Sequence, residues 1–187
     1  MDSLSDTIST QGLIVIAERP WPGPDRVFGA ENPLIVGLDR VQDPGNVGTL
    51  LRTAEAAGAS GIMSFAGSAD AYSPKTLRSA MGSAFRLPIV ADVSGAGAVS
   101  ACRAKGIRCV AACGDGEVHY DDYDWRQPTM LILGNEGRGV EPELALLCDV
   151  RVSIPLHSSV ESLNVAAAGA AILFEAARQR RGVMRDA

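Results

Sequence analysis

The feature that most constrains this chain is an apolar run that ends in a glycine-rich turn. Residues 130–133 carry only apolar side chains, and Gly-Asn-Glu-Gly-Arg-Gly follows at 134–139. A strand that is apolar at every position is typical of a parallel sheet covered on both faces, because a half-exposed strand would alternate. Glycines after such a strand let backbone groups come close to a ligand, since no Cβ stands in the way. The pattern predicts a buried parallel strand that leads into a ligand-binding loop.

Short β-type runs recur along the chain and alternate with segments of helical character. We expect strands at residues 12–17, 34–38, 61–65, 87–90, 108–112, 130–133 and 150–154. This alternation predicts a single α/β domain in which helices flank a parallel sheet, and ligands bind such sheets at the carboxyl ends of the strands. A chain of 187 residues, 47% of them hydrophobic and 21% charged, is long enough for one such domain.

Capping residues and apolar stripes predict the helices. Asn46 is a suitable N-cap for a helix that stops at Gly58, and Ser73 caps a second helix that begins near Pro74. Residues 18–32 are expected to form a loop, and the remaining helices are expected at 97–105, after Pro142 and from 163 to about 180. The first half of the last helix carries small, apolar residues on every side. We therefore expect other parts of the protein to cover every side of it, and a second copy of the chain to provide part of that cover.

Charge and cysteine content exclude several classes of protein. The formal net charge of −5 argues against binding nucleic acid by bulk electrostatics, although a local cluster can still attract phosphates. Five cationic residues fall in or near the polar turns: Arg52, Lys75, Arg78, Arg86 and Arg138. The four cysteines form no C-x-x-C pair, so we expect no metal site and mostly buried free thiols. No apolar stretch is long enough for a bilayer and the N-terminus lacks a basic signal, which predicts a soluble cytoplasmic protein.

Three polar segments follow predicted strands, at residues 43–52, 134–139 and 154–165. Each of them allows two interpretations. In the first, Asn46 can be a cap and Arg52 a solvated group, or helix amides and the guanidinium can form a phosphate site. In the second, Glu136 can cap the next segment or stand as an acid at the edge of a cofactor wall. In the third, Ser162 can be an N-cap with Asn164 behind it, or it can face a substrate.

The glycine order of residues 134–139 is neither the G-x-G-x-x-G of a dinucleotide fold nor a P-loop, so both of those sites are excluded. The two histidines, His119 and His157, are expected in loops rather than as catalytic bases.

Three ordered motifs together resemble those of the SpoU branch of the SPOUT RNA methyltransferases. They are Asn46-x-Gly48-x-x-x-Arg52, the stretch Leu-Gly-Asn-Glu-Gly-Arg-Gly at 133–139, and Ile-Pro-Leu at 154–156 followed by Ser-Leu-Asn-Val at 162–165. Residues 71–88 also resemble the family's segment between its first two motifs. The likeness covers roughly residues 30–180, nearly the whole chain.

The resemblance implies a parallel α/β domain whose C-terminal part forms a deep trefoil knot, a rare exception to the rules of chain topology. It implies an S-adenosylmethionine pocket made by knot loops, and a homodimer that packs through the C-terminal helix and shares its active site. The implied reaction methylates a ribose 2′-hydroxyl of RNA and needs no metal. Residues 1–30 resemble the junction after an extra RNA-recognition domain, which we expect this chain to lack. That junction favours ribosomal RNA over transfer RNA as the substrate.

Carried over by position, the resemblance assigns two sets of residues. Those that match the binders of S-adenosylmethionine are Gly134, Ile154 and Leu163, and those that match the polar active-site set are Asn46, Arg52, Glu136, Ser162 and Asn164. Because a guanidinium keeps its proton at neutral pH, we expect Arg52 to clamp a phosphate rather than act as a base. Glu136 and Asn46 would hold Arg52 or the substrate, and Ser162 and Asn164 would position the hydroxyl.

The chain departs from the family at two positions. Ser158 stands where the family commonly has glycine, and Ala166 where it often has serine.

Two other functions remain open. A catalytically silent RNA-binding or ribosome-assembly module on the same fold would not bind S-adenosylmethionine. A nucleotide-binding α/β protein that acts on small molecules would show turnover without RNA. All five polar active-site residue types are present, which favours the methyltransferase.

Overall fold

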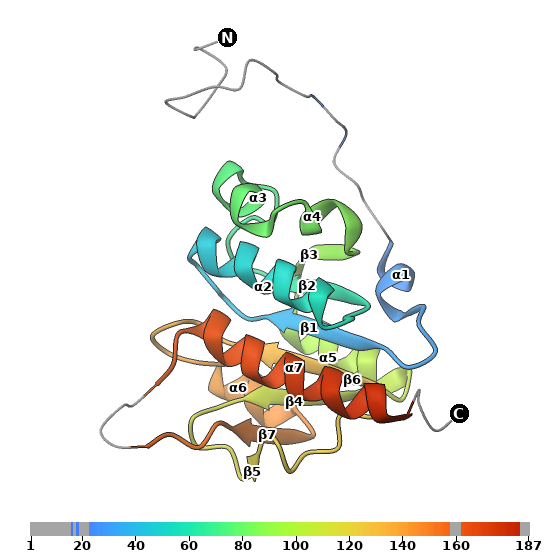
Figure 1. Ribbon diagram of the computed structural model, residues 1–187, viewed down its shortest axis with the longest axis vertical. Coiled ribbons are helices and arrows are strands. Elements are labelled where there is room, and N and C mark those ends of the chain that lie inside the picture. The colour runs from blue at the N-terminus through green and yellow to red at the C-terminus, as the bar shows by residue number, and fades with distance from the viewer. Residues whose placement is uncertain (1–15, 17, 19–22, 158–161, 184–187) are drawn as a thin grey trace.

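The computed structural model describes residues 16, 18, 23–157 and 162–183. Within them, seven strands form one sheet in which every neighbouring pair is parallel (Figure 1). The strands are β1 (Leu34–Leu38), β2 (Gly61–Phe65), β3 (Ile89–Val93), β4 (Arg108–Ala112), β5 (Val118–His119), β6 (Thr129–Leu133) and β7 (Val150–Ser153). Their spatial order is β3-β2-β1-β6-β4-β7-β5. The predicted parallel α/β sheet is confirmed.

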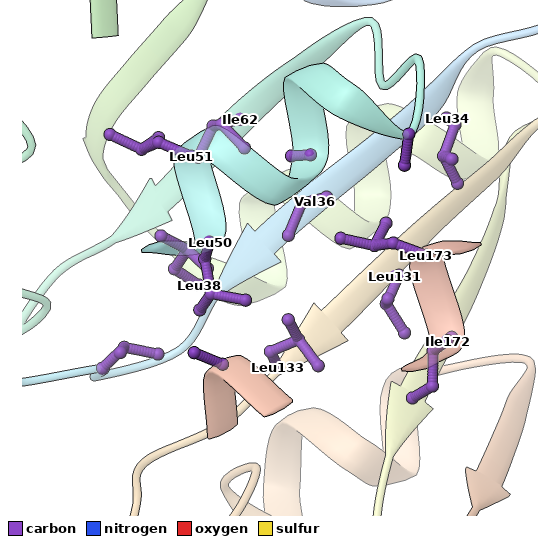
Figure 2. Close-up of a cluster of buried hydrophobic side chains, with 14 of the residues drawn as sticks. Leu34, Val36, Leu38, Leu50, Leu51, Ile62, Leu131, Leu133, Ile172 and Leu173 are labelled. Carbon is purple, nitrogen blue, oxygen red and sulfur yellow. The ribbon is translucent and has the colours of Figure 1, made fainter. Parts of the chain in front are cut away.

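Helices cover both faces of the sheet and enclose two apolar cores (Figure 1). On one face lie α2 (Pro44–Ala56), α3 (Pro74–Ala80), α4 (Ser83–Arg86) and α7 (Val165–Val183), and on the other α1 (Pro24–Phe28), α5 (Gly95–Ala104) and α6 (Pro142–Leu147). Figure 2 shows the first core, where Val36 and Leu133 of the sheet meet Leu50 of α2 and Ile172 of α7. Among the helices described, none is long and apolar enough to cross a membrane.

The predicted strands at 34–38, 61–65 and 108–112 match the structure residue for residue. The run predicted at 87–90 instead forms β3, Ile89–Val93, because Pro88 has no N–H for the ladder and the strand continues beyond a kink at Asp92, whose φ is 57°. Three short elements were missed: β5 has two residues and therefore no periodicity, α1 is a five-residue helix within the predicted loop, and α4 is a four-residue helix after Gly82. The predicted strand at 12–17 lies almost wholly outside the described residues.

Two predicted helix caps are wrong. The N-cap of α2 is Asp43, whose carboxylate accepts the N–H of Asn46 at 3.0 Å, and Pro44 occupies the first helical position. The N-cap of α7 is Asn164, whose Oδ1 accepts the N–H groups of the second and third helical residues at 2.9 and 3.3 Å. Ser162 therefore lies outside the helix. Ser73 does cap α3, as expected.

Glycines allow α2 to approach its neighbours closely. A Cβ on Gly48 of α2 would stand 1.9 Å from Ser79 Oγ on α3, and a Cβ on Gly169 of α7 would stand 2.5 Å from Leu50 Cδ2 on α2. Only glycine fits at such contacts. The first contact packs α3 against α2, and the second packs the N-terminal half of α7 against α2.

Candidate active site

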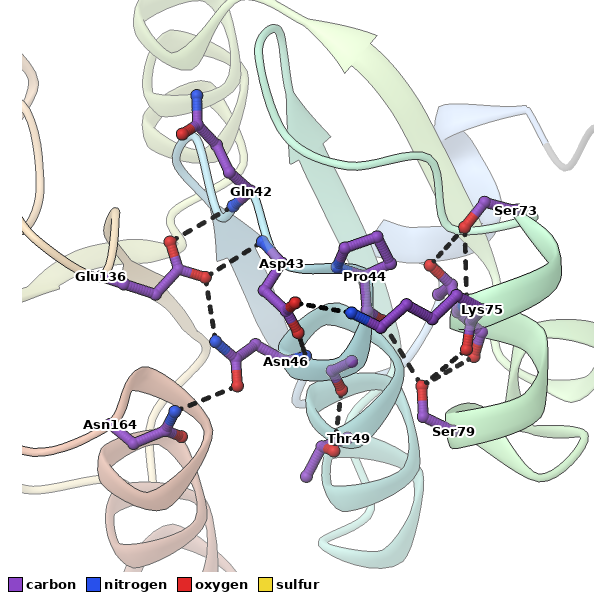
Figure 3. Close-up of polar contacts among 12 residues, drawn as sticks. Gln42, Asp43, Pro44, Asn46, Thr49, Ser73, Lys75, Ser79, Glu136 and Asn164 are labelled. Atoms are coloured by element: carbon purple, nitrogen blue, oxygen red, sulfur yellow. Dashed lines mark hydrogen bonds and ion pairs between the residues drawn. The ribbon is translucent and has the colours of Figure 1, made fainter.

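The order of the strands brings two distant polar segments together. β1 and β6 are neighbours in the sheet, and Leu38 at the end of one is in register with Leu133 at the end of the other. The segments that follow them, residues 39–46 and 134–141, therefore meet at the carboxyl edge, where ligands bind parallel sheets (Figure 3).

Glu136 is the centre of the contacts between these segments. Its carboxylate accepts the backbone N–H of Gln42 at 3.3 Å, the backbone N–H of Asp43 at 3.2 Å and the side-chain Nδ2 of Asn46 at 3.0 Å (Figure 3). Partial burial works against ionisation of Glu136, but these hydrogen bonds outweigh it and hold the pKa of the carboxyl below its ordinary value. Glu136 therefore stays ionised and fixes the start of α2, and it caps no helix of its own.

Asn46 and Asn164 continue the chain of hydrogen bonds from Glu136. Asn46 Oδ1 accepts Asn164 Nδ2 at 3.1 Å. The direction of every bond is determined, because an ionised carboxylate can only accept and Asn164 Oδ1 is already occupied by the N–H groups of α7. Each amide nitrogen thus keeps one N–H with no partner within the described part of the chain, and these two donors are available to a ligand.

Asp43 connects these hydrogen-bonded residues to α3. Its second carboxylate oxygen pairs with Lys75 Nζ at 2.8 Å, in addition to its bond to Asn46 N (Figure 3). The Lys75 contact and the Asn46 contact lower the pKa of the Asp43 carboxyl. Lys75 is therefore already engaged with a carboxylate.

A cavity of about 310 Å³ opens beside the Glu136 carboxylate. The glycine-rich loop forms one wall with residues 134–139, and apolar side chains from β6, β7 and α7 form the others, including Leu133, Val152, Val165 and Ile172. The volume and the apolar lining are those of a small-molecule site. The three positions expected to bind a cofactor, Gly134, Ile154 and Leu163, all line it, as does Glu136.

The tight turn around this cavity requires glycine at position 134. A Cβ there would stand 2.0 Å from Val140 N and 2.1 Å from Gly139 C, both of them backbone atoms. The turn is closed by two hydrogen bonds between Asn135 and Gly139, at 2.9 and 2.8 Å, and Gly139 has a φ of 71°. A larger residue at 134 would open the turn that forms the cavity wall.

Two of the five polar candidates lie apart from the hydrogen-bonded chain. Arg52 is exposed on α2 and lines a second hollow of about 330 Å³ together with Thr49 and with Phe174 of α7. Ser162 lines the first cavity. Across the described ranges, neither side chain makes a hydrogen bond or an ion pair.

The predicted cationic cluster divides into two groups. Lys75 pairs with Asp43, and Arg86 pairs with Glu55, whose pKa falls to about 2 chiefly through that contact. The side chains of the other three are exposed and form no ion pair with another described residue: Arg52, Arg78 and Arg138. All three remain available for an anion.

Sequence reasoning missed the residues that connect the two segments from behind. Asp39 is buried and accepts the backbone N–H of Glu141, while Asn135 Nδ2 donates to the carbonyl of Arg40. An acidic residue directly after a fully apolar strand was the available signal, because a buried carboxylate needs a partner.

The SpoU rRNA methylase family matches this chain over residues 33–174. The chain belongs to that family. It is 42% identical over 173 residues to a 23S rRNA (uridine(2479)-2′-O)-methyltransferase from Streptomyces viridochromogenes, covering 90% of this chain and 60% of that one. It is 34% identical over 172 residues to the 23S rRNA (guanosine(2553)-2′-O)-methyltransferase RlmP from Bacillus subtilis, covering 92% of this chain and 67% of the relative.

Solved structures of SpoU methyltransferases share the fold. The crystal structure of AviRb from Streptomyces viridochromogenes in complex with the cofactor AdoMet superposes with a TM-score of 0.81 at 42% identity, over 87% of this chain and 66% of that one. The chain thus spans about two thirds or less of these longer relatives.

Proposed function

We propose that this SpoU-family protein transfers a methyl group from S-adenosylmethionine to a ribose 2′-hydroxyl of RNA, with ribosomal RNA favoured over transfer RNA. One observation carries the proposal: Glu136 belongs both to the wall of the cavity and to the hydrogen-bonded chain that ends in free amide donors. A cofactor site and a polar substrate site therefore adjoin each other. The ribosomal RNA relatives support the choice of substrate, which implies a cytoplasmic protein.

The residues around the cavity suit S-adenosylmethionine, which supplies an activated methyl group when bound. Gly134, Ile154 and Leu163 would hold it, with backbone groups of the glycine-rich turn available for hydrogen bonds and aliphatic side chains for the rest of the molecule. The missing Cβ at Gly134 keeps that wall close to the cavity. No metal enters the proposed reaction.

The chain's own residues would align the substrate. The free N–H groups of Asn46 and Asn164 can hold a ribose oxygen. Glu136 orients the amide of Asn46, and Asn46 together with the start of α7 orients that of Asn164. Glu136 already accepts three hydrogen bonds and its pKa is lowered, which makes it a poor proton acceptor for the hydroxyl. Arg52, exposed and without an ion partner in the described part of this subunit, would clamp a phosphate, and Ser162 at the cavity rim would position the hydroxyl.

We further infer one knotted domain that acts as a homodimer through α7. The order of the strands, with β6 inserted between β1 and β4, and the likeness to SpoU methyltransferase structures support the trefoil knot. Phe174 on α7 is 48% exposed and borders the same hollow as Arg52, so a second copy on this face would bury the ring and complete the site around the guanidinium.

The test is incubation with labelled S-adenosylmethionine and total RNA from a strain that lacks the gene, followed by mapping of the modified ribose. Arg52→Ala should abolish transfer and leave cofactor affinity nearly intact, whereas Arg26→Ala, which removes an exposed arginine of α1 on the opposite face of the sheet, should retain activity. Equal loss of both properties in Arg52→Ala would contradict the assigned role. Failure of the intact protein to bind S-adenosylmethionine in calorimetry would favour the catalytically silent RNA-binding module.

A further inference from the structure

The glycine-rich loop is held at its base by three charged residues outside the family motifs. Asp39 follows β1 and is 5% exposed. Its Oδ2 accepts the backbone N–H of Glu141, where the loop ends, at 2.8 Å. Arg40 completes the group: its guanidinium lies 3.3 Å from Asp39 Oδ1 and 2.6 Å from Glu141 Oε2. One buried carboxylate and one guanidinium thus join the end of β1 to the end of the loop.

The backbone of Arg40 holds the start of the same loop. Its carbonyl accepts Asn135 Nδ2 at 3.0 Å, and Asn135 Oδ1 in turn accepts the N–H groups of Gly137 and Arg138 at 3.0 and 3.2 Å. Arg40 has a φ of 54°, a left-handed conformation that a residue with a side chain rarely adopts. Such a conformation persists only where surrounding contacts enforce it, and it is common beside functional sites.

The position of these contacts determines what they can control. The loop between Asn135 and Glu141 forms one wall of the cavity and carries Glu136, while Asp39 and Arg40 lie only a few residues before Asn46 on the opposite segment. Movement at the base would therefore change the cavity wall and the distance between Glu136 and Asn46 together.

We propose that Asp39, Arg40 and Glu141 form a clamp of positioning residues that sets the glycine-rich loop for cofactor binding and couples it to the substrate site. The inference rests on the proposed function, because the cofactor is taken to be S-adenosylmethionine. None of the three residues lines the cavity, so each acts through the loop.

The principal measurement is the dissociation constant of S-adenosylmethionine, by calorimetry on the intact protein without RNA. Asp39→Ala leaves the N–H of Glu141 without an acceptor and removes the carboxylate that pairs with Arg40. It should weaken binding about tenfold, the effect of one lost hydrogen bond to a charged group. Glu141→Gln keeps the backbone contact and removes only an exposed ion pair, so the loss should be about threefold. This milder variant keeps the test decisive should Asp39→Ala fail to fold.

A double-mutant cycle tests whether Arg40 and Glu141 act as a pair. Arg40→Asn removes the guanidinium and tolerates the left-handed backbone. Arg40→Asn and Glu141→Gln each remove the ion pair between these two side chains. The dissociation constant of the double variant should therefore be no higher than that of whichever single variant binds the cofactor less tightly. The matched control is Glu55→Gln, which breaks the similarly exposed ion pair between α2 and α4 and should leave the dissociation constant unchanged.

A purely structural role would lower the melting temperature but leave cofactor affinity unchanged well below that temperature. Wild-type affinity in Asp39→Ala and Glu141→Gln, with a wild-type protein that binds, would overturn the clamp alone. Absence of binding in the wild type would instead overturn the proposed function and the clamp with it. Weakened cofactor binding together with a lower kcat at saturating cofactor supports the clamp and its coupling to the substrate site. Weakened cofactor binding with wild-type kcat and KM for RNA would overturn that coupling.

Discussion

Replacement of Glu136 by glutamine tests the hydrogen-bonded chain most directly. The carboxylate accepts three donors, two on Oε1 and one on Oε2. A glutamine side chain has one acceptor oxygen, and its amide nitrogen must face at least one N–H donor. The best orientation keeps the two contacts of Oε1 as neutral hydrogen bonds and loses the contact with Gln42.

The expected loss follows from these contacts. Hydrogen bonds to a charged group contribute about 1.5–3 kcal/mol and neutral ones about 1 kcal/mol, and solvent reduces both at an exposed side chain such as Glu136. We expect Glu136→Gln to lower the free energy of unfolding by about 1 kcal/mol near neutral pH. Because the hydrogen bond that orients Asn46 changes from a charged to a neutral one, kcat should fall about tenfold.

The dependence on pH gives the sharpest check. The folded-state pKa of Glu136 lies below the ordinary value of 4.5, so its stabilising contribution is complete above that value and is lost as the pH falls through the folded-state pKa. Urea unfolding of both proteins should therefore show a difference that shrinks in acid. Glu31→Gln, at an exposed glutamate with no ion pair among the described residues, should change the free energy of unfolding by less than about 0.5 kcal/mol near neutral pH. A difference that is constant with pH, or wild-type turnover in Glu136→Gln, would refute the reasoning.

Three further substitutions test other contacts of the site and its support. Asn164→Asp keeps the cap of α7 but loses the donor to Asn46, so rates should fall about tenfold at a nearly unchanged melting temperature. Asn164→Ala also removes the cap and should lower the free energy of unfolding by about 1 kcal/mol. Wild-type rates in Asn164→Asp would show that the hydrogen bond between Asn164 and Asn46 does not contribute to the reaction. Gly134→Ala should destabilise by about 3 kcal/mol in thermal melts, because its Cβ meets backbone only. Arg180→Met removes the donor to the carbonyls of Trp125 and Gln127, both at 2.8 Å, and should cost about 2 kcal/mol in urea unfolding; a change below about 0.5 kcal/mol would show that these contacts add nothing.

The strands could be predicted because their physical cause is local. In the central strands of a parallel sheet covered on both faces every position is buried, so runs such as 34–38 and 61–65 are read from composition alone. The glycine-rich turn was equally visible, since glycine is required where backbone meets backbone, as at Gly134.

Local patterns misassigned the caps for a physical reason. Asp43, Asn46, Ser162 and Asn164 can all cap a helix, and only the backbone conformation selects which one does. Asn46 is freed from capping by Asp43 and turns toward Glu136 instead, whereas Asn164 both caps α7 and contacts Asn46. One residue type thus serves two roles that sequence spacing does not distinguish.

The sequence by itself determined the fold class, the family and the residues from which a site could be built. Only the tertiary structure decided which of them meet. Because β6 lies beside β1, Glu136 contacts Asn46 at a sequence separation of 90 residues, and Glu141 contacts Asp39 at a separation of 102 residues. Arg52 stays outside these hydrogen bonds and lines a second hollow. Such contacts depend on the order of strands in the sheet, which follows from packing of the whole chain and leaves no periodic trace in the segments themselves.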